Sequence, residues 1–364
     1  MKIRDVIKVI EDFAPLQYAE DFDNVGLIVG DPEASLSGIL VSLDTLEFTV
    51  QEAIEKNCNL IVSFHPIIFK GLTKIVGKNY VEKAVIKAIK NDIHIYAIHT
   101  ALDNHVLGVS AKMAEKLSLV NTCILIPKSG QLKRLSTYVP VKNGEDLRMA
   151  LFEAGAGHIG NYDHCSFNWQ GKGTFRGNDA SNPVLGTKGK DHEEHEMCIQ
   201  VIFESHQEKT ILKALKENHP YEEVAFEVVT LDNLHQNIGL GMVGDLDKEM
   251  SAPDFLDQLK HKFHLKVIRH SDLLDKKIKR VAVLGGSGSF AIENAITAGA
   301  DIYVTADLKY HDFFRAENKI VLADIGHYES EQFTKNLLVE LLSKKITNFA
   351  IILSEKNTNP INYY

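Results

Sequence analysis

A histidine and a glutamate near the C-terminus are spaced so that they could bind one metal ion. His327 and Glu331 stand four residues apart, between an apolar run at 319–322 that predicts a strand and a helix predicted over 332–344. Residues four apart lie on one face of a helix, so the imidazole and the carboxylate would point the same way. The alternative is a helix start whose acidic residues complement the helix dipole, which accounts for Glu331 but not for His327.

Two further predicted strands end in residues of the same kind. His65 follows the apolar strand predicted over 60–64, and His99 and Asp103 follow the strand predicted over 93–98. A lone histidine after a strand is more often a hydrogen-bonded loop residue than a ligand. In an α/β sheet, however, ligands bind beyond the carboxyl ends of the strands. Three such strand ends together predict about five nitrogen and oxygen ligands, enough for one or two divalent ions.

Another histidine–acid pair, Asp307 and His311, follows the strand predicted over 301–305. The simpler interpretation is an N-cap aspartate followed by a histidine on a helix face. The interpretation that we favour places both residues at the rim of the metal site, where they would orient ligands or transfer protons. His99 is a candidate for the same proton-transfer role.

A glycine-rich segment offers a rival to the metal site. Gly-Gly-Ser-Gly-Ser at 285–289 joins a predicted strand to a predicted helix, so its amides could bind a phosphate. Gly286, Gly288 and Ala291 fit a variant of the dinucleotide-binding motif, with Asp307 in the place of the ribose ligand. A tight strand-to-helix turn explains the same glycines. The dinucleotide interpretation also leaves the histidines at the three strand ends without a role.

Alternating strands and helices in the first and last thirds of the chain predict an α/β architecture. This spacing favours a mostly parallel sheet covered by helices on both faces. From 135 to 232 the predicted order changes to βαββαβ, which is that of a ferredoxin-like domain. We therefore predict one α/β unit in two parts, residues 1–126 and 237–364, with an inserted ferredoxin-like domain at 127–236.

Within this predicted insert, residues 178–195 form a polar stretch rich in Gly, Asp and Glu. Such a composition predicts a mobile loop. The stretch ends in His-Glu-Glu-His at 192–195. These four residues could bind a metal, but a solvated run of charges is the simpler interpretation.

Composition and charge narrow the classes of function. The 364 residues are 45% hydrophobic and 24% charged, as in ordinary globular proteins, and no apolar run has membrane-span length. The formal net charge of −9 makes nucleic acid an unlikely partner. The basic run at 276–280 is better explained as the solvent-exposed start of a strand than as a nucleic-acid contact. The four cysteines are far apart and form no C-x-x-C pair, which favours a reducing, cytoplasmic location.

The candidate residues occur in segments that together resemble the Nif-three-like family, whose members are named GTP cyclohydrolase type 2 homologues. These segments are DFDNVGL at 21–27, SFHP at 63–66, HTALD at 99–103, GGSG at 285–288, TAD at 305–307 with His311, and GHYESE at 326–331. The resemblance covers the whole chain. The predicted insert is similar to the CutA/PII-like insert of the longer bacterial members.

This resemblance implies a dinuclear metal site between the two α/β parts and a toroidal homohexamer. Glu331 would be able to bridge both ions, and the ligands at the matching positions are His65, Asp103, His327 and Glu331. Many members have two consecutive histidines before the proline of SFHP, where this chain has Phe64. One ion would therefore lack a ligand, or would recruit His99 or water.

These observations favour a cytoplasmic metal-dependent hydrolase that acts on a nucleotide or a related small polar substrate. Two adjacent divalent ions lower the pKa of a bound water and stabilise the charge of a transition state. Zinc is the first candidate metal, and manganese, iron or cobalt suits the same nitrogen and oxygen ligands. The alternative is a non-catalytic metal-binding or regulatory hexamer whose insert senses a ligand. A transcription-linked scaffold is a third, less favoured interpretation.

Overall fold

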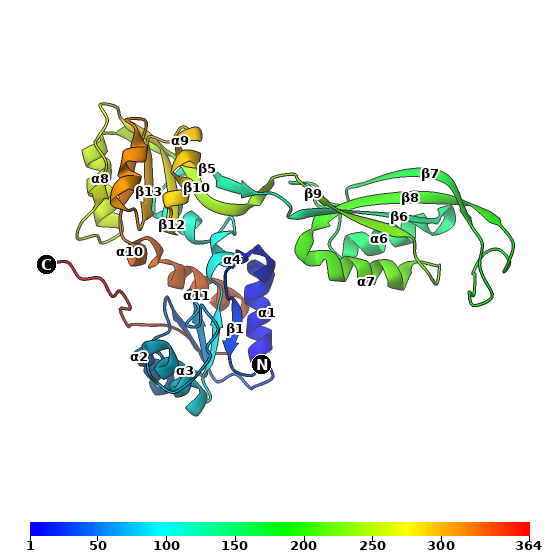
Figure 1. Ribbon diagram of the computed structural model, residues 1–364, viewed down its shortest axis with the longest axis horizontal. Coiled ribbons are helices and arrows are strands. Elements are labelled where there is room, and N and C mark those ends of the chain that lie inside the picture. The colour runs from blue at the N-terminus through cyan, green and yellow to red at the C-terminus, as the bar shows by residue number, and fades with distance from the viewer. The chain divides into compact units, whose positions relative to one another are not determined.

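The computed structural model describes all 364 residues, and the chain divides into two compact units (Figure 1). Unit 1 comprises Met1–Pro127 and Gln236–Tyr364, and unit 2 comprises Lys128–His235. No helix in the protein is both long enough and apolar enough to span a membrane.

The first sheet of unit 1 contains five strands in the order β1-β4-β3-β2-β15. Their bounds are β1 Gly26–Val29, β2 Ile39–Ser42, β3 Leu60–Ser63, β4 His94–Ala97 and β15 Ile351–Leu353. All neighbouring strands run parallel except β1, which pairs antiparallel with β4. Their carboxyl ends therefore meet at one edge of the sheet, where ligands bind in folds of this kind.

Helices cover both faces of this first sheet. They are α1 (Ile3–Phe13), α2 (Glu47–Glu55), α3 (Tyr80–Lys90) and α11 (Thr334–Lys345). Val41 and Val62 pack in one hydrophobic core with α1 and α11, whereas Leu40 and Ile61 pack in another with α2 and α3. Because successive side chains of a strand point to opposite faces, a strand buried on both sides is an unbroken apolar run, as the sequence shows.

The second sheet of unit 1 contains six strands in the order β11-β14-β13-β12-β10-β5. Their bounds are β5 Val120–Lys128, β10 His235–Met250, β11 Arg269–His270, β12 Ile278–Ser287, β13 Ile302–Ala306 and β14 Val321–Asp324. The central strands β12, β13 and β14 run parallel. Helices α5 (Val109–Leu117) and α8 (Ala252–Lys262) pack in one core of this sheet, and α9 (Ile292–Thr297) packs in the other.

Each part of unit 1 contributes a strand to the sheet of the other part. β5 comes from the first part of the chain and forms an edge of the second sheet. β15 is the last strand of the chain, and its Ile351 pairs with Ile39 of β2 in the first sheet. The two sheets of unit 1 are therefore interlocked.

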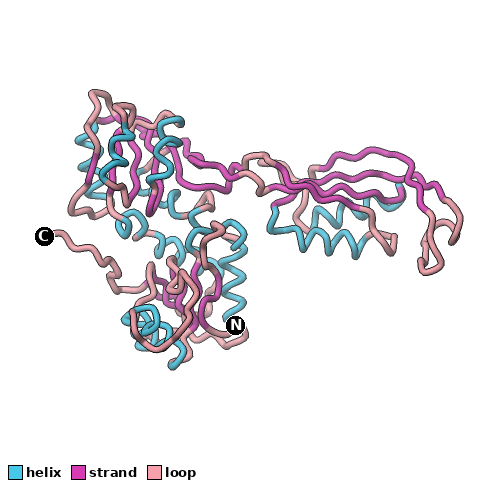
Figure 2. Tube along the Cα trace, in the orientation of Figure 1, coloured by secondary structure: helices cyan, strands magenta, loops and turns pink.

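Unit 2 has the element order βαββαβ that the sequence predicts. The elements are β6 (Leu132–Pro140), α6 (Gly144–Glu153), β7 (Ser166–Phe175), β8 (His192–Glu204), α7 (Glu208–Asn218) and β9 (Phe226–Leu231). The strands form an antiparallel sheet in the order β7-β8-β6-β9. Figure 2 shows α6 and α7 on the same face of this sheet, and no helix covers the opposite face. The mixed α/β fold with several sheets is therefore confirmed.

One predicted loop is partly a strand. Residues 192–195, predicted as the end of a mobile loop, begin β8, where His192 pairs with Phe175 and His195 with Lys172. Side chains alternate along a strand, so His192 and His195 point to opposite faces. The two histidines cannot bind one ion together, and Nε2 of His192 lies 3.2 Å from Oε2 of Glu194 instead.

Two predicted helices also differ near the candidate site. The helix expected after β13 is a 3-10 helix, Tyr310–Ala316. The helix expected over 332–344 is α11, and a separate short helix, α10 (His327–Glu331), precedes it. His327 and Glu331 are thus the first and last residues of their own helical turn.

Candidate metal centre

Three metal-ligating side chains converge where strands of the two sheets of unit 1 end. His65 follows β3, and His327 and Glu331 belong to α10, which follows β14. One ligand atom of each residue lies within 4.8 Å of the other two. Nε2 of His65 is 3.1 Å and Nε2 of His327 is 3.2 Å from Oε2 of Glu331. The spacing of four residues and the position at strand ends have therefore brought these three side chains together.

The unsatisfied carboxylate oxygen shows that this cluster suits a cation. Glu331 is only 3% exposed, and its buried Oε2 accepts no hydrogen bond. The two imidazole nitrogens are close to this oxygen, but neither has the direction of a hydrogen bond to it. A buried acceptor without a partner is costly in a native structure. Two imidazole nitrogens and one carboxylate oxygen are a donor set that binds zinc and related divalent ions. The residues present thus fit a divalent ion.

A carboxylate holds the second ring nitrogen of each of these histidines. Nδ1 of His65 lies 2.8 Å from Oδ1 of Asp44, and Nδ1 of His327 lies 2.7 Å from Oδ2 of Asp307. An ionised carboxylate can only accept, so Nδ1 carries the hydrogen in both pairs. Nε2 is then free to bind a metal, and the carboxylate makes the imidazole a more basic ligand. Asp307 therefore contacts His327 on the side of the ring that faces away from Glu331.

His99 forms a third pair of this kind beside the cluster. It begins α4 (His99–Asp103), and its Nδ1 lies 2.8 Å from Oδ1 of Asp23. Burial would raise the pKa of Asp23, but hydrogen bonds from His99 and Thr100 outweigh it and lower that pKa to about 2. The ring centre of His99 is 5.2 Å from that of His65. His99 therefore lies next to the ligands, although it is outside the group of three.

Asp103, at the end of α4, lies within electrostatic reach of the cluster. Burial raises the pKa of its carboxyl group, and the negative charge of Glu331 raises it further. The charges of His65 and His327 act on it in the opposite direction. Two carboxylates this close to each other resist simultaneous ionisation unless a cation lies between or beside them.

The pKa values of the two histidines show how negative this site is. Burial alone would lower both values, but the adjacent carboxylates reverse that effect. Asp44 and Glu331 raise the pKa of His65 to about 10, and Asp307 and Glu331 raise that of His327 to about 11. The same histidines lower the pKa of Glu331 against the effect of burial. The site therefore attracts positive charge, as protons or as a metal ion.

The glycine-rich segment makes room for Glu331 and does not form a phosphate-binding loop. Gly286 belongs to the end of β12 and has a φ of +68°, and a Cβ there would lie 2.4 Å from Oε1 of Glu331. Its amide donates a 2.9 Å hydrogen bond to the hydroxyl of Ser330, so it is not free to bind a phosphate. The segment that suggested a dinucleotide site is thus part of the wall around the candidate ligand.

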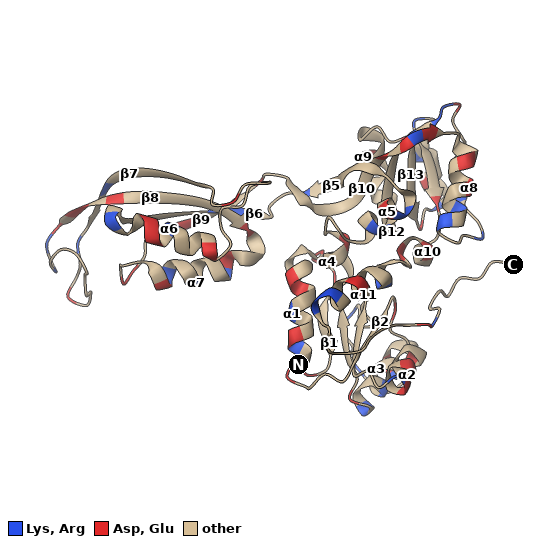
Figure 3. Cartoon of the chain, turned by 180° about the vertical axis from the view of Figure 1, so that it is seen from behind, with Lys and Arg blue, Asp and Glu red and all other residues tan.

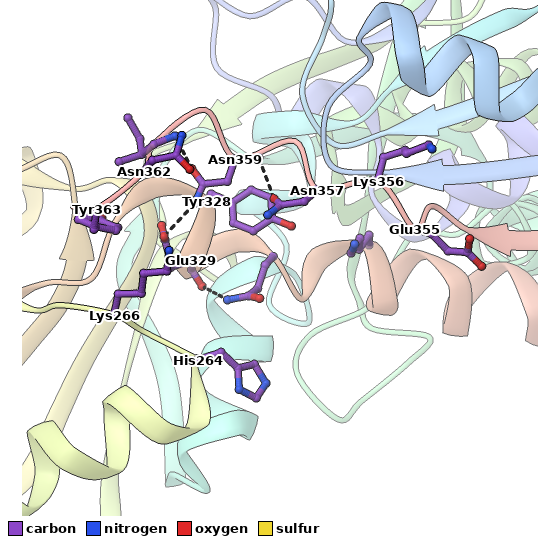
Figure 4. Close-up of a pocket in the computed structure, with 13 residues that line it drawn as sticks. His264, Lys266, Tyr328, Glu329, Glu355, Lys356, Asn357, Asn359, Asn362 and Tyr363 are labelled. Atoms are coloured by element: carbon purple, nitrogen blue, oxygen red, sulfur yellow. Dashed lines mark hydrogen bonds between the residues drawn. The ribbon is translucent and has the colours of Figure 1, made fainter.

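The C-terminal segment contacts the same site from outside. The hydroxyl of Thr358 donates a hydrogen bond to Oδ2 of Asp44, whose other oxygen holds His65. Nδ2 of Asn359 lies 2.9 Å from Oε1 of Glu329, and Figure 4 shows this contact beside α10. The segment and α10 border a cavity of about 350 Å³, whose lining includes Tyr328, Glu329, Lys266, Lys335, Lys356 and Asn357. A polar pocket with three lysines therefore shares α10 with the candidate ligands.

Two other residues singled out in the sequence are outside the group of three. His311 is exposed, and its ring contacts Tyr310 and Phe314 but none of the cluster residues. None of these contacts supports the predicted position of His311 at the rim of the site, which stays a prediction. Phe64 is fully buried in the core of the first sheet, and its ring centre lies 4.8 Å from that of His65.

A model of the family described as Duf34/NIF3 (NGG1p interacting factor 3) matches residues 1–360. The chain belongs to the Duf34/NIF3 family. The resemblance that the strand-end motifs suggested is therefore confirmed.

Relatives within the Duf34/NIF3 family match along their full length. A Bacillus subtilis protein named GTP cyclohydrolase 1 type 2 homolog is 36% identical over 373 residues, which cover 99% of this chain and 98% of that protein. A Staphylococcus epidermidis protein with the same name is 34% identical over all of both chains. Among solved structures, a Bacillus cereus protein related to NIF3 matches with a TM-score of 0.86 and 36% identity, over 100% of this chain and 99% of that chain. A Staphylococcus aureus protein matches with a TM-score of 0.80 and 31% identity, with the same coverage.

Proposed function

We propose that this protein is a metal-dependent hydrolase with a dinuclear centre, acting on a nucleotide or a related small polar substrate. The observation that carries the proposal is the convergence of His65, His327 and Glu331, with a carboxylate holding each imidazole in the orientation that a metal ligand needs. The names of the curated relatives support the substrate class, since they are GTP cyclohydrolase 1 type 2 homologs.

The two ions would be held by residues at four positions. His65, His327 and Glu331 would bind one ion, and Asp103 would bind the second, with Glu331 shared between them. Zinc is the first candidate, and manganese, iron or cobalt fits the same donor atoms. When bound, such ions lower the pKa of a water ligand and stabilise negative charge that develops on the substrate.

Other residues would bind the substrate and move protons. His99 donates its Nδ1 hydrogen to Asp23, which leaves Nε2 able to accept a proton next to the ligands. Asp307 would fix the orientation of His327 and keep its Nε2 available. Lys266, Lys335 and Lys356, in the pocket beside α10, would attract the anionic part of a nucleotide. We do not retain His311 in this mechanism.

Metal content of purified variants tests the ligand assignment. Glu331→Ala should lose most of the metal and stay folded, because the ionised side chain serves the ion and not the hydrophobic core. Glu55→Ala, which removes an exposed carboxylate on α2, is the matched control and should keep its metal. Unchanged metal content in Glu331→Ala would show that the assignment is wrong.

A separate assay tests the reaction. Metal-loaded protein should hydrolyse at least one member of a nucleotide panel, and the activity should disappear after chelation and return with metal. Cyclohydrolase chemistry in particular must release formate from GTP. Activity that survives chelation, with metal loss verified by elemental analysis, would exclude this mechanism, and hydrolysis without formate would exclude the cyclohydrolase reaction alone.

A non-catalytic metal-binding or regulatory role is the second candidate, and Phe64 favours it. The resemblance implies a histidine at the position where this chain has the buried Phe64, so one ion would have one protein ligand fewer. A metal-loaded protein that turns over no nucleotide under any metal would support this role. A transcription-linked scaffold is less favoured, because acids pair with the basic run at 276–280: Lys276 with Asp301, Lys277 with Glu249 and Arg280 with Asp245. Figure 3 shows both signs of charge interspersed over the chain.

The assembly and the location are also part of the proposal. We propose a toroidal homohexamer in which residues 127–236 form an inserted CutA/PII-like domain of ferredoxin-like topology, and the βαββαβ order of unit 2 supports this. We further propose a cytoplasmic location, which the four free cysteines support. Sedimentation of the full chain tests the oligomeric state.

A further inference from the structure

Packing does not hold the Asp307–His327 pair of the candidate metal centre in place. The side chain of Asp307 is 48% exposed, and that of His327 is 42% exposed. The Asp307 carboxylate has no hydrogen-bond partner in the protein other than Nδ1 of His327. The orientation of the pair therefore comes from the two turns that carry it, one after β13 and one after β14.

Both turns have a backbone conformation that needs support. Asp307 has a φ of +56°, and Gly326, directly before His327, has a φ of +91°. A positive φ is uncommon for a residue with a side chain, and it persists where the surrounding structure fixes it. A Cβ at Gly326 would also clash with Oε2 of Glu329, so this position requires glycine. The groups that fix the two turns therefore set the directions of the Asp307 and His327 side chains.

One buried carboxylate, that of Asp324, joins the two turns. Asp324 is the last residue of β14 and is 5% exposed. Its Oδ1 accepts a 3.0 Å hydrogen bond from the amide of Gly326, and its Oδ2 accepts a 2.9 Å hydrogen bond from the amide of Leu308. Leu308 follows Asp307 and is itself buried. Each oxygen of Asp324 thus holds the backbone beside one member of the Asp307–His327 pair.

Arg269 of β11 completes this arrangement. β11 pairs with β14 so that Arg269 lies directly opposite Asp324. Nη2 of Arg269 donates to Oδ2 of Asp324, and it also donates a 2.8 Å hydrogen bond to the carbonyl oxygen of Leu308. The guanidinium lies 5.6 Å from the ring centre of Phe313, in the 3-10 helix after β13. Both backbone polar groups of Leu308 are therefore occupied, and the charge of the buried carboxylate is compensated.

We propose that Asp324 and Arg269 are positioning residues of the metal centre. They act through the backbone of 307–308 and 326–327, and they direct Nε2 of His327 towards the ion. Neither side chain belongs to the group of three ligating residues. Loss of a group that orients a metal ligand typically lowers metal affinity about 10- to 100-fold. The inference rests on the metal centre of the proposed function but not on the reaction assigned to it.

The zinc affinity of the full-length protein, measured by competition with a chelator of known affinity, tests the proposal. Asp324→Asn keeps the shape of the side chain but turns an amide N–H₂ towards one of the two backbone amides, so one turn loses its acceptor. We expect zinc affinity to fall about tenfold.

A second variant keeps the test valid if Asp324→Asn does not fold. Arg269→Met leaves both hydrogen bonds from the backbone amides and removes the two that the guanidinium donates. We expect its zinc affinity to lie between those of the wild type and Asp324→Asn. The Arg269 side chain is 55% exposed, so this variant should fold.

Asp301→Asn is the matched control for a loss of stability alone. Asp301 precedes β13 at the other end of that strand, and its Oδ2 accepts 2.8 Å hydrogen bonds from the amides of Lys279 and Arg280. Asp301→Asn should therefore lower the thermal unfolding temperature but bind zinc as the wild type does. Cobalt(II) in place of zinc gives a second readout, because its visible absorption depends on the number and geometry of its ligands. The spectrum should change in Asp324→Asn and stay the same in Asp301→Asn.

The proposal is overturned if folded Asp324→Asn and Arg269→Met bind zinc as tightly as the wild type and give its cobalt spectrum. It is also overturned if Asp301→Asn weakens zinc binding as much as Asp324→Asn does, because the effect would then follow from stability.

Glu331→Ala distinguishes a failure of this proposal from a failure of the ligand assignment. If Glu331→Ala keeps its zinc, the assigned metal centre is wrong, and the proposal falls with it. If Glu331→Ala loses its zinc while Asp324→Asn and Arg269→Met keep theirs, only the positioning role is refuted. A wild type that hydrolyses no nucleotide, with the expected losses of zinc affinity in the two variants, would support the positioning role and refute the hydrolase.

Discussion

Replacing Asp44 with asparagine tests whether the carboxylate behind His65 is part of the metal centre. Oδ1 of Asp44 accepts from Nδ1 of His65 at 2.8 Å, and its other oxygen accepts from Thr358. An asparagine has the same shape and can keep an acceptor toward His65, so the change removes mainly the negative charge. That charge makes the imidazole a stronger ligand, and we therefore expect weaker metal binding in a folded protein.

The expected loss of zinc affinity in Asp44→Asn depends on how far the Asp44 side chain is exposed to solvent. Loss of such a supporting group typically lowers metal affinity about 10- to 100-fold. The side chain of Asp44 is 31% exposed, and solvent screens its charge, so we expect the lower end, about tenfold, or about 1.4 kcal/mol. The measurement is competition for zinc between the protein and a chelator of known affinity at fixed pH. Asp12→Asn, which changes an exposed carboxylate on α1, should bind zinc as the wild type does.

The hydrogen bond from Thr358 to Asp44 allows a second variant, with a smaller expected effect on zinc affinity. Thr358→Val removes the hydroxyl that donates to Asp44 but keeps the charge, so its effect on zinc affinity should be smaller than that of Asp44→Asn. If Asp44→Asn binds zinc within twofold of the wild type while His65→Ala does not, the carboxylate has no role in the metal centre. If Thr358→Val is the more damaging change, the C-terminal segment acts in some way other than through Asp44.

Three more predictions follow from the same contacts. Gly286→Ala should reduce metal content in elemental analysis, since its Cβ would lie 2.4 Å from Glu331, whereas Gly71→Ala, with open space around it, should not. The free energy of unfolding of the metal-free protein should fall as pH rises from 6.5 towards 10 or 11. His65 and His327 have raised pKa values in the folded protein, so their protonated forms stabilise the fold, and this stabilisation is lost as they deprotonate. The decrease in the free energy of unfolding should be smaller for the metal-bound protein. An equal decrease with and without metal would contradict the assignment of these pKa values to His65 and His327. Replacing 135–232 with a short Gly/Ser linker should leave metal content intact, because β6 and β9 are paired neighbours and the chain ends are close; a folded but metal-free product would mean that unit 2 helps to build the site.

Local patterns in the sequence were sufficient for many of the helices and strands and for the three clustered candidate ligands. Strands were predicted over 60–64 and 301–305, where the structure has β3 and β13. The rule that ligands follow parallel strands placed His65 and His327 correctly beside each other. The same rule could have found Asp44, which follows β2 in the same manner. It could not have found Asp23, which lies in a loop with no periodic pattern.

Features that depend on distant segments were not predictable in this way. The strand β8 begins at His192 because its polar first residues pair with β7, and that pairing depends on the register of the hairpin and not on local hydrophobicity. His311 was placed on a regular helix, whereas the chain forms a 3-10 helix there. The assignment of β5 and β15 to the opposite sheets is equally non-local, because a short apolar strand does not reveal its partner.

The exchange of strands between the two sheets of unit 1 has a consequence for biosynthesis. β2 pairs with β15 on one side, so this edge of β2 stays unpaired until residues 351–353 have been synthesised. An unpaired apolar edge promotes association with other chains, so the pairing with β15 removes a site of unwanted association. His65 and Glu331 can come together only after residues up to 331 have been synthesised. An ion that needs both side chains would therefore bind only to a chain in which the two parts of unit 1 have already folded together.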